Sequence, residues 1–171
     1  MNEVIKNILS RRSIRSFSDK KISKEDLETL VKCAIHAPSA RNLQTWRFTV
    51  LTEQEDIKAL IAVIGKALNN DGYDMYKPAA IIIPSNSIDS PYGRDDNACA
   101  LENIFLAAHS LGIGSVWINQ LNGICDNQKV RELLTKYEIP SNHVVFGMAA
   151  LGYPSDAEPK KVEKTGQVKF F

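Results

Sequence analysis

The most informative segment of this chain is Arg11-Arg12-Ser13-Ile14-Arg15-Ser16-Phe17. Three arginines and two serines fall within seven residues, directly after a short amphipathic segment. The guanidinium is a planar fork of donors that matches phosphate oxygens, and a phosphate carries about two charges, so an arginine cluster predicts a phosphate clamp. Arginine runs near a terminus are also common on solvated surfaces. The segment alone therefore leaves both interpretations open.

The size and composition of the chain are those of one globular domain. Its 171 residues are 44% hydrophobic and 24% charged, with a formal net charge of +1. Nucleic-acid binders usually carry a strong basic excess, which this chain lacks. No signal peptide and no apolar run long enough to cross a bilayer are visible. We therefore expect a cytoplasmic protein that binds neither nucleic acid nor membrane.

The cysteines argue against a disulfide framework or a zinc site. Cys33, Cys99 and Cys125 are odd in number, far apart in sequence, and form no C-x-x-C pair. Cys33 and Cys99 lie in apolar helical patterns, so we expect them to be small core residues. This use of cysteine is typical of a reducing compartment.

Hydrophobic periodicity divides the chain into alternating helices and strands. Apolar spacing of three and four residues predicts helices at residues 4–9, 27–35, 57–64, 95–111 and 130–137. Alternating or continuous apolar runs predict strands at residues 46–51, 79–83, 115–119 and 144–151. No repeat or linker interrupts this order. We expect one domain in which helices cover a sheet, in an α/β or α+β arrangement.

Short signals mark the ends of these elements. Ser23, Thr52 and Asp126 each precede a predicted helix and are expected to cap it, the first two in capping boxes. Gly112 is expected to close the helix before it. Pro84 is expected to stop the strand before it, because proline has no N–H for a sheet ladder.

The C-terminal segment differs from the rest of the chain. After Gly152-Tyr153-Pro154 it is polar and rich in lysine, and it ends in Phe170-Phe171. Such a segment has little to bury except its two terminal aromatic rings. We therefore expect a single domain over residues 1–171, in which residues 153–171 form an arm that packs on a partner subunit.

A second polar segment, residues 37–46, lies between a predicted helix and a predicted strand. Asn42 and Gln44 each offer a donor and an acceptor, which suit the edge of a flat heterocycle. A helix-to-strand turn also needs proline, serine and asparagine for its shape. Taken alone, the segment favours the turn.

The sequence contains no recognisable catalytic dyad. His36, His109 and His143 are isolated, and no nucleophile elbow, zinc-protease motif or Walker loop is present. Gly112-Ile113-Gly114 lacks the third glycine of a dinucleotide fingerprint and runs from helix into strand, the reverse of that motif. A phosphate clamp without a dyad indicates that a bound cofactor supplies the chemistry.

Four segments occur in an order that identifies a family. They are R-R-S-I-R-S-F at 11–17, A-P-S-A-R-N-L-Q-T-W at 37–46, D-N-A-C-A-L-E-N with L-A-A-H-S-L-G-I-G-S-V-W-I within 96–118, and G-Y-P at 152–154 before the basic tail. Together they resemble the nitroreductase family of FMN-dependent oxidoreductases over nearly the whole chain. Two departures are Thr45, where the family usually has proline, which is expected to loosen the turn, and a short 85–93 loop in place of extra helices.

The resemblance implies a set of FMN contacts at matching positions. It assigns the phosphate and ribityl chain to Arg11, Arg12, Ser13 and Arg15. It assigns the flavin lining, partly contributed by a second subunit, to Pro38, Ser39, Ala40, Asn42 and Gln44. It places Trp117, Ile118 and Asn119 along the ring. It also implies a basic tail residue at the phosphate, for which Lys164 is favoured over Lys160 and Lys161.

The resemblance further implies the fold and the reaction. The expected fold is α+β, a central, mostly antiparallel sheet flanked by helices, in an intertwined homodimer with two FMN sites at the interface. The expected reaction is ping-pong reduction of a small electron-poor acceptor, such as a nitroaromatic or quinone, by NADH or NADPH. Two alternatives stay open: a flavin-dependent dehalogenase or dehydrogenase, and a non-catalytic protein that binds or stores FMN.

Overall fold

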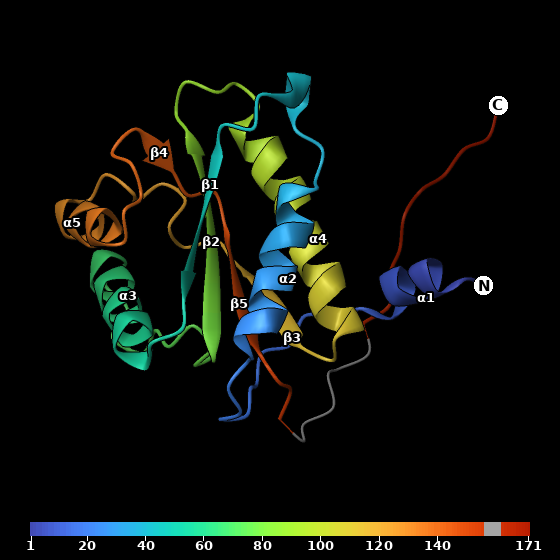
Figure 1. Cartoon of the computed structure of the whole chain (residues 1–171), viewed down its shortest axis with the longest axis horizontal. Helices are drawn as coiled ribbons and strands as arrows, with labels where there is room; N and C mark the ends of the chain where they lie inside the picture. Colours follow the sequence, from blue (N-terminus) through green and yellow to red (C-terminus); the bar gives the residue numbers. More distant parts are fainter. Residues whose placement is uncertain (156–161) are drawn as a thin grey trace.

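The chain folds as a sheet between two layers of helices, in the α+β arrangement that the sequence predicts (Figure 1). The computed structural model describes residues 1–155 and 162–171. Helices α2 (Lys24–Ile35) and α4 (Gly93–Ser110) cover one face of the sheet. Helices α3 (Gln54–Ala67) and α5 (Gln128–Lys136) cover the other.

The sheet is antiparallel throughout. Its main path runs β1-β2-β5-β3, and a short strand, β4, also pairs with β2. The bounds are β1 Trp46–Leu51, β2 Ala80–Ser87, β3 Gly114–Ile118, β4 His143–Val144 and β5 Met148–Gly152. The predicted strand at 46–51 is confirmed residue for residue.

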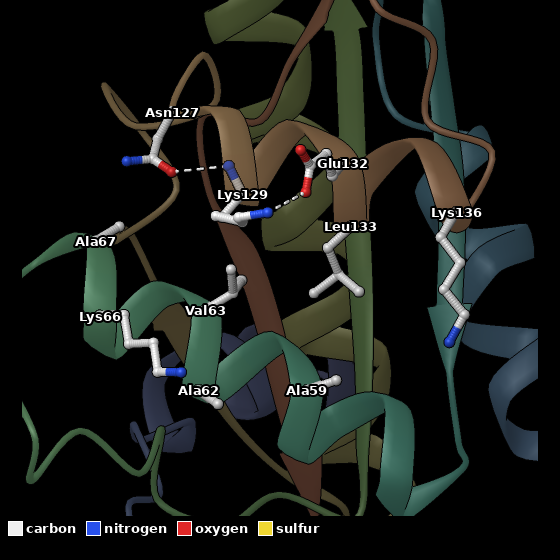
Figure 2. A pocket seen from close by; sticks show the side chains of 10 residues that line it. All are labelled: Ala59, Ala62, Val63, Lys66, Ala67, Asn127, Lys129, Glu132, Leu133 and Lys136. Atoms are coloured by element: carbon white, nitrogen blue, oxygen red, sulfur yellow. Dashed lines mark hydrogen bonds and ion pairs between the residues drawn. The ribbon is translucent and has the colours of Figure 1, made fainter.

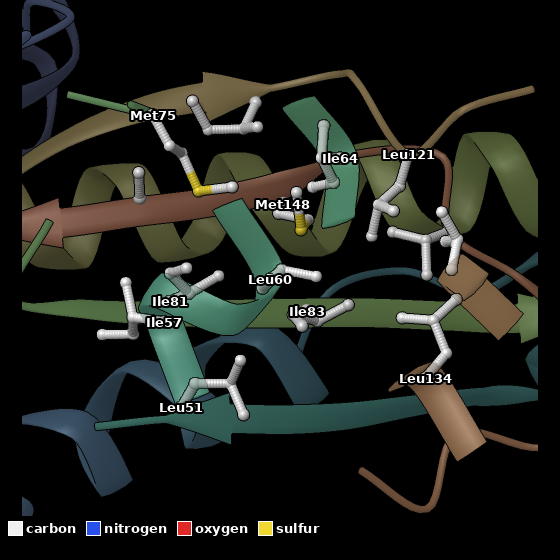
Figure 3. Packing of buried hydrophobic residues seen from close by; sticks show 14 of the residues in the cluster. Leu51, Ile57, Leu60, Ile64, Met75, Ile81, Ile83, Leu121, Leu134 and Met148 are labelled. Carbon is white, nitrogen blue, oxygen red and sulfur yellow. The ribbon is translucent and has the colours of Figure 1, made fainter. Parts of the chain in front are cut away.

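Two apolar cores fill the spaces between the sheet and the helices. Successive residues of a strand point to opposite faces, so Ile81 and Ile83 pack toward α3 and α5 whereas Ala80 and Ile82 pack toward α2 and α4. All four are at most 1% exposed. Figure 3 shows Leu60 of α3 lying over β2 in the first of these cores. Burial on both faces explains the continuous apolar run at this strand.

The predicted helix ends are partly right. Ser23 caps α2, because its hydroxyl accepts from the Asp26 N–H at 3.0 Å. Thr52 does not cap α3: the N-cap is Glu53, which makes no side-chain capping bond. Asn127, not Asp126, caps α5.

The physical reasons for the misplaced caps are local. The Thr52 hydroxyl lies toward the Glu53 carboxylate, at 3.5 Å, instead of the helix amides. The Asp126 carboxylate pairs with Arg131 at 3.2 Å. Gly112 closes α4 as predicted, with φ at +71°, a left-handed conformation that glycine adopts without strain.

Three further expectations are corrected. Strand β2 does not stop at Pro84 but continues to Ser87. On one side, residues 80–82 of β2 pair with β5 and residues 86–87 pair with β4, so Pro84 lies in the gap between the two pairings. No strand needs a backbone N–H from residue 84 there, and a proline is tolerated. The predicted 144–151 strand is two strands, interrupted where Gly147 lies against the Trp117 indole. Cys99 is exposed, since α4 buries the stripe that contains Ala100, Leu101 and Ile104.

The segment that contains the arginine cluster runs along the outer edge of β3. The Ile14 N–H donates to the Ser115 carbonyl at 2.9 Å, and the Ser18 N–H donates to the Tyr153 carbonyl at 2.9 Å. Gly114 permits this approach, since an added Cβ would lie 2.9 Å from the Ile14 side chain. The preceding helix, α1 (Glu3–Ser10), has no buried residue. Within the described residues, no helix is long and apolar enough to cross a membrane.

Candidate functional site

The first two arginines of the cluster lie where α1 ends. The Arg11 side chain is 21% exposed, and its Nε is 3.9 Å from Glu102 Oε1 on α4. Arg12 Nη1 donates to the carbonyl oxygens of Leu9 and Arg11, at 2.9 Å each. The last carbonyls of a helix have no intrahelical donors, so this guanidinium serves as a cap for α1. Both cations are therefore held at one end of α1.

Helix α1 is fastened to the second half of α4. Asn7 Nδ2 donates to the Leu106 carbonyl at 2.9 Å, and Ser10 Oγ lies 2.8 Å from His109 Nε2. Burial, followed by the nearby charges of Arg11 and Arg12, lowers the pKa of His109 below its usual value. The neutral imidazole is thereby favoured beside the arginine cluster.

The third arginine, Arg15, lies beside a cavity of about 310 Å³. Its guanidinium carbon is 5.9 Å from the centroid of the Tyr76 ring, which lines this cavity. The same cavity is lined by Trp117, Ile118 and Asn119, at the end of β3. The predicted residues Trp117, Ile118 and Asn119 therefore line one cavity, and Arg15 reaches it through its contact with Tyr76.

The sequence gives no signal for the loop that closes this cavity. Met75, Tyr76 and Lys77 have φ angles of +51°, +62° and +51°, although none is glycine. A left-handed conformation of a non-glycine residue costs about 1–3 kcal/mol and tends to be found at functional sites. Asp74 closes the turn, because its carboxylate accepts from the Tyr76 N–H and its carbonyl from the Lys77 N–H, at 2.9 Å each.

A second tyrosine of this loop carries an unsatisfied polar atom. The hydroxyl of Tyr73 is buried and has no hydrogen-bond partner among the described residues. Burial, and then the neighbouring Tyr76 and Asp74, raise the pKa of this phenol, so it remains protonated. Tyr73 also lines the cavity beside Arg15. Buried hydroxyl groups in folded proteins nearly always have a hydrogen-bond partner, so this one is an exception.

The second polar segment is held by the start of α4. Asp96 is 4% exposed, and its carboxylate accepts from the Ala40 N–H at 2.9 Å and the Ser39 hydroxyl at 3.1 Å. The Ser39 hydroxyl in turn accepts from the Gln44 N–H at 2.9 Å. Gln44 Nε2 donates to Asn42 Oδ1 at 2.8 Å. The predicted lining residues Ser39, Ala40, Asn42 and Gln44 thus form one bonded turn, while Pro38 is exposed before it.

Thr45 does not loosen this turn. Its hydroxyl donates to the buried Asn86 Oδ1 at 2.7 Å. The bond fastens the turn to β2, which a proline at this position could not do because it has no side-chain donor.

Within one chain, the arginine cluster and the Ser39–Gln44 turn contact different parts of α4. Asp96 holds the turn, whereas the Leu106 carbonyl receives the bond from α1. Along this continuous helix, Asp96 lies about 9 Å from Glu102, which pairs with Arg11, and about 15 Å from Leu106. In Figure 1, η1 (Ala40–Asn42) lies beside the upper end of α4 and α1 beside its lower end. One chain does not bring the two halves of the predicted site together.

The tail lysines add no contact to either half in the described structure. Lys164 is exposed, and it takes part in no hydrogen bond or ion pair among the described residues. Lys160 and Lys161 lie outside the described residues.

A larger groove, of about 730 Å³, lies elsewhere, between α3 and α5 (Figure 2). Its floor is apolar, with Ala59, Ala62 and Val63 among its residues. Lys129 on its rim pairs with Glu132 at 3.0 Å. None of the residues predicted to bind a cofactor lines this groove.

A family comparison covers most of the chain. The model of the family described as the nitroreductase family matches residues 8–153. This range includes every predicted contact except Lys164.

Individual relatives are similar over nearly the whole of this chain. A protein of Archaeoglobus fulgidus, provisionally named NADH dehydrogenase/NAD(P)H nitroreductase, is 42% identical over 162 residues, which are 91% of this chain and 88% of the relative. An FMN reductase (NADPH) of Bacillus subtilis is 29% identical, over 94% of this chain and 70% of the relative. A crystal structure of a nitroreductase with bound FMN from Bacteroides fragilis superimposes with a TM-score of 0.91, at 34% identity and full coverage of both chains.

Proposed function

This chain belongs to the nitroreductase family, and from that premise we propose that it is an FMN-dependent oxidoreductase. Its reductant is NADH or NADPH, and its acceptor is a nitroaromatic, a quinone or a similar electron-poor small molecule. The proposal is supported by the bound FMN of the Bacteroides fragilis structure and by the names of the two sequence relatives.

The observation that carries the proposal is the arginine cluster, whose third member, Arg15, lies beside the Tyr76 ring at the cavity. Arg11, Arg12 and Arg15 supply three cations within five residues, and only Glu102 lies within ion-pair distance of any of them among the described residues. A net excess of positive charge with planar donors suits a phosphate monoester. The residues present therefore fit FMN.

We propose that a second copy of the chain completes the site. In one chain the turn is bonded to Asp96 and Arg11 pairs with Glu102, about 9 Å further along α4. No hydrogen bond or ion pair among the described residues joins the arginine cluster to the turn, so we assign the turn of each site to another subunit. Helix α1 exposes Val4, Ile5, Ile8 and Leu9 by 45–67% of their surface. Phe170 and Phe171 are fully exposed at the end of the chain. Exposed apolar residues in such numbers indicate an interface, here a homodimer interface.

Each half has a defined task in this proposal. When bound, FMN supplies the redox chemistry: it takes a hydride, which is two electrons and one proton, from NAD(P)H and passes two electrons to the acceptor, whose further proton comes from water. Arg11, Arg12 and Ser13 hold the phosphate end, and Arg15 adds positive charge. The amides of Asn42 and Gln44 orient the ring by its polar edge, and Trp117, Ile118 and Asn119 lie along it. Lys164 is proposed to reach the phosphate from the tail.

The test is reconstitution followed by reduction. The purified protein is incubated with FMN, the free cofactor is removed, and the bound flavin is titrated without oxygen with NADH and with NADPH. We expect one FMN per chain and loss of its oxidised absorption with at least one nucleotide, followed by recovery when a quinone or nitroaromatic is added. If FMN is retained but neither nucleotide reduces it, the protein binds FMN and the proposed reaction is wrong. If no FMN is retained, the proposal as a whole is overturned.

A further inference from the structure

We infer that Tyr76 is a positioning residue, which holds the Arg15 guanidinium at the mouth of the cavity next to β3. The inference rests on the proposed function, because it concerns how the protein presents Arg15 to FMN. Nothing in the sequence motifs points to Tyr76. It follows from three features of the structure: the surroundings of Arg15, the conformation of the loop that carries Tyr76, and the position of both residues at the cavity.

Among the described residues, the Arg15 guanidinium has one recorded side-chain contact, with the Tyr76 ring. Arg15 is exposed, and no carboxylate lies within ion-pair distance of it among the described residues. Its guanidinium carbon lies 5.9 Å from the centroid of the Tyr76 ring, within the range of a cation–π interaction. A long side chain on a surface otherwise samples many rotamers, so the aromatic face selects those that point to the cavity.

The loop places the Tyr76 ring by a conformation that most residues avoid. Three successive non-glycine residues, Met75 to Lys77, are left-handed. Such a run persists only where its surroundings fix it. Met75 is 2% exposed and belongs to the core under α3, and the Asp74 carboxylate holds the Tyr76 N–H. The buried methionine and the aspartate together anchor the turn, and Tyr76 is the residue that the turn projects, 39% exposed.

The position of the pair connects it with the predicted ligand contacts. Tyr76 lines the same cavity as Trp117 and Asn119. The backbone before Arg15 is fixed to β3 by the Ile14 N–H, which donates to the Ser115 carbonyl at 2.9 Å. The Arg15 backbone and the Tyr76 ring therefore approach the cavity from two separately anchored segments. A cation held in this way is oriented before the anionic cofactor arrives, and preorganisation of this kind lowers the cost of binding.

Three substitutions distinguish an effect of the aromatic ring of Tyr76 from an effect of the size of its side chain. Tyr76→Phe keeps an aromatic face, whereas Tyr76→Leu has similar bulk but no π system. Both are measured by FMN fluorescence in an equilibrium titration of the full chain, beside Arg15→Ala. We expect Tyr76→Phe to bind FMN as the wild type does and Tyr76→Leu to bind about 2- to 5-fold more weakly, the strength of an exposed cation–π contact.

The decisive comparison is the double variant. If Tyr76 acts through Arg15, adding Tyr76→Leu to Arg15→Ala changes the FMN dissociation constant no further, because the cation that the ring directs is gone. An equal loss from Tyr76→Leu in both backgrounds, or equal losses from Tyr76→Phe and Tyr76→Leu, would overturn the inference. These results are distinct from failure of the proposed function, in which the wild-type protein itself does not bind FMN.

Discussion

Replacing Asp96 by alanine tests whether the start of α4 builds the second half of the site. The carboxylate receives two hydrogen bonds, from the Ala40 N–H and the Ser39 hydroxyl. A hydrogen bond to a charged group contributes about 1.5–3 kcal/mol. Ser39 and Ala40 are only partly buried, so water can replace some of the loss and the lower value applies to each. We expect Asp96→Ala to lower the free energy of unfolding by about 3 kcal/mol.

The control for this variant is the preceding residue. Asp95 also lies in the first turn of α4, but its side chain is exposed and makes no hydrogen bond among the described residues. Asp95→Ala removes the same interaction with the helix dipole, about 0.3–1 kcal/mol, without touching the turn. Urea unfolding at one fixed protein concentration measures both variants, since association affects stability. Equal destabilisation by the two substitutions would refute the assignment of Asp96 as the anchor of the turn.

Two further predictions concern Trp117 and the histidines. Gly147→Ala places a Cβ 2.6 Å from the Trp117 indole, so we expect a loss of about 1–3 kcal/mol of stability and a changed near-ultraviolet circular dichroism spectrum. Gly166→Ala, which meets no atom within 4 Å, should change neither. Burial and nearby arginines lower the pKa values of His109 and His143 below 6.5 in the folded chain. The unfolded chain then binds protons first, so stability should fall as the pH drops below 6.5. Replacing both histidines by glutamine should flatten that slope in pH-dependent urea unfolding.

The sequence predicts the elements whose signals are local. Ser23 and Gly112 correctly predict the helix ends beside them, because capping geometry depends on a few neighbouring residues. Thr52 and Asp126 mislead for the same reason: each carries capping chemistry, but each lies one residue before the N-cap of its helix, Glu53 or Asn127. Pro84 misleads because a strand excludes proline only where a ladder bond is needed, and the pairing of β2 is a property of the whole sheet.

The candidate site is predicted in part for related reasons. The arginine cluster and the Asn42–Gln44 segment are visible as motifs, yet their separation along α4 is a consequence of the fold. The Tyr76 loop has no sequence signal at all, because its left-handed residues are methionine, tyrosine and lysine where glycine would be expected. Asp96 begins one of the recognised segments, but only the structure shows that its carboxylate bonds the turn.

The central claim is that each flavin site combines the arginine cluster of one subunit with the Ser39–Gln44 turn of another. The most direct measurement mixes two defective proteins, Arg11→Ala with Arg15→Ala in one, and Asn42→Ala with Gln44→Ala in the other, and then unfolds and refolds them together. In a mixed dimer of the proposed kind, one site has both halves intact and the other has both altered. We predict that FMN binding and NAD(P)H-dependent reduction return in the refolded mixture, although neither protein shows them alone. Mixed dimers that form and stay inactive would contradict the shared site.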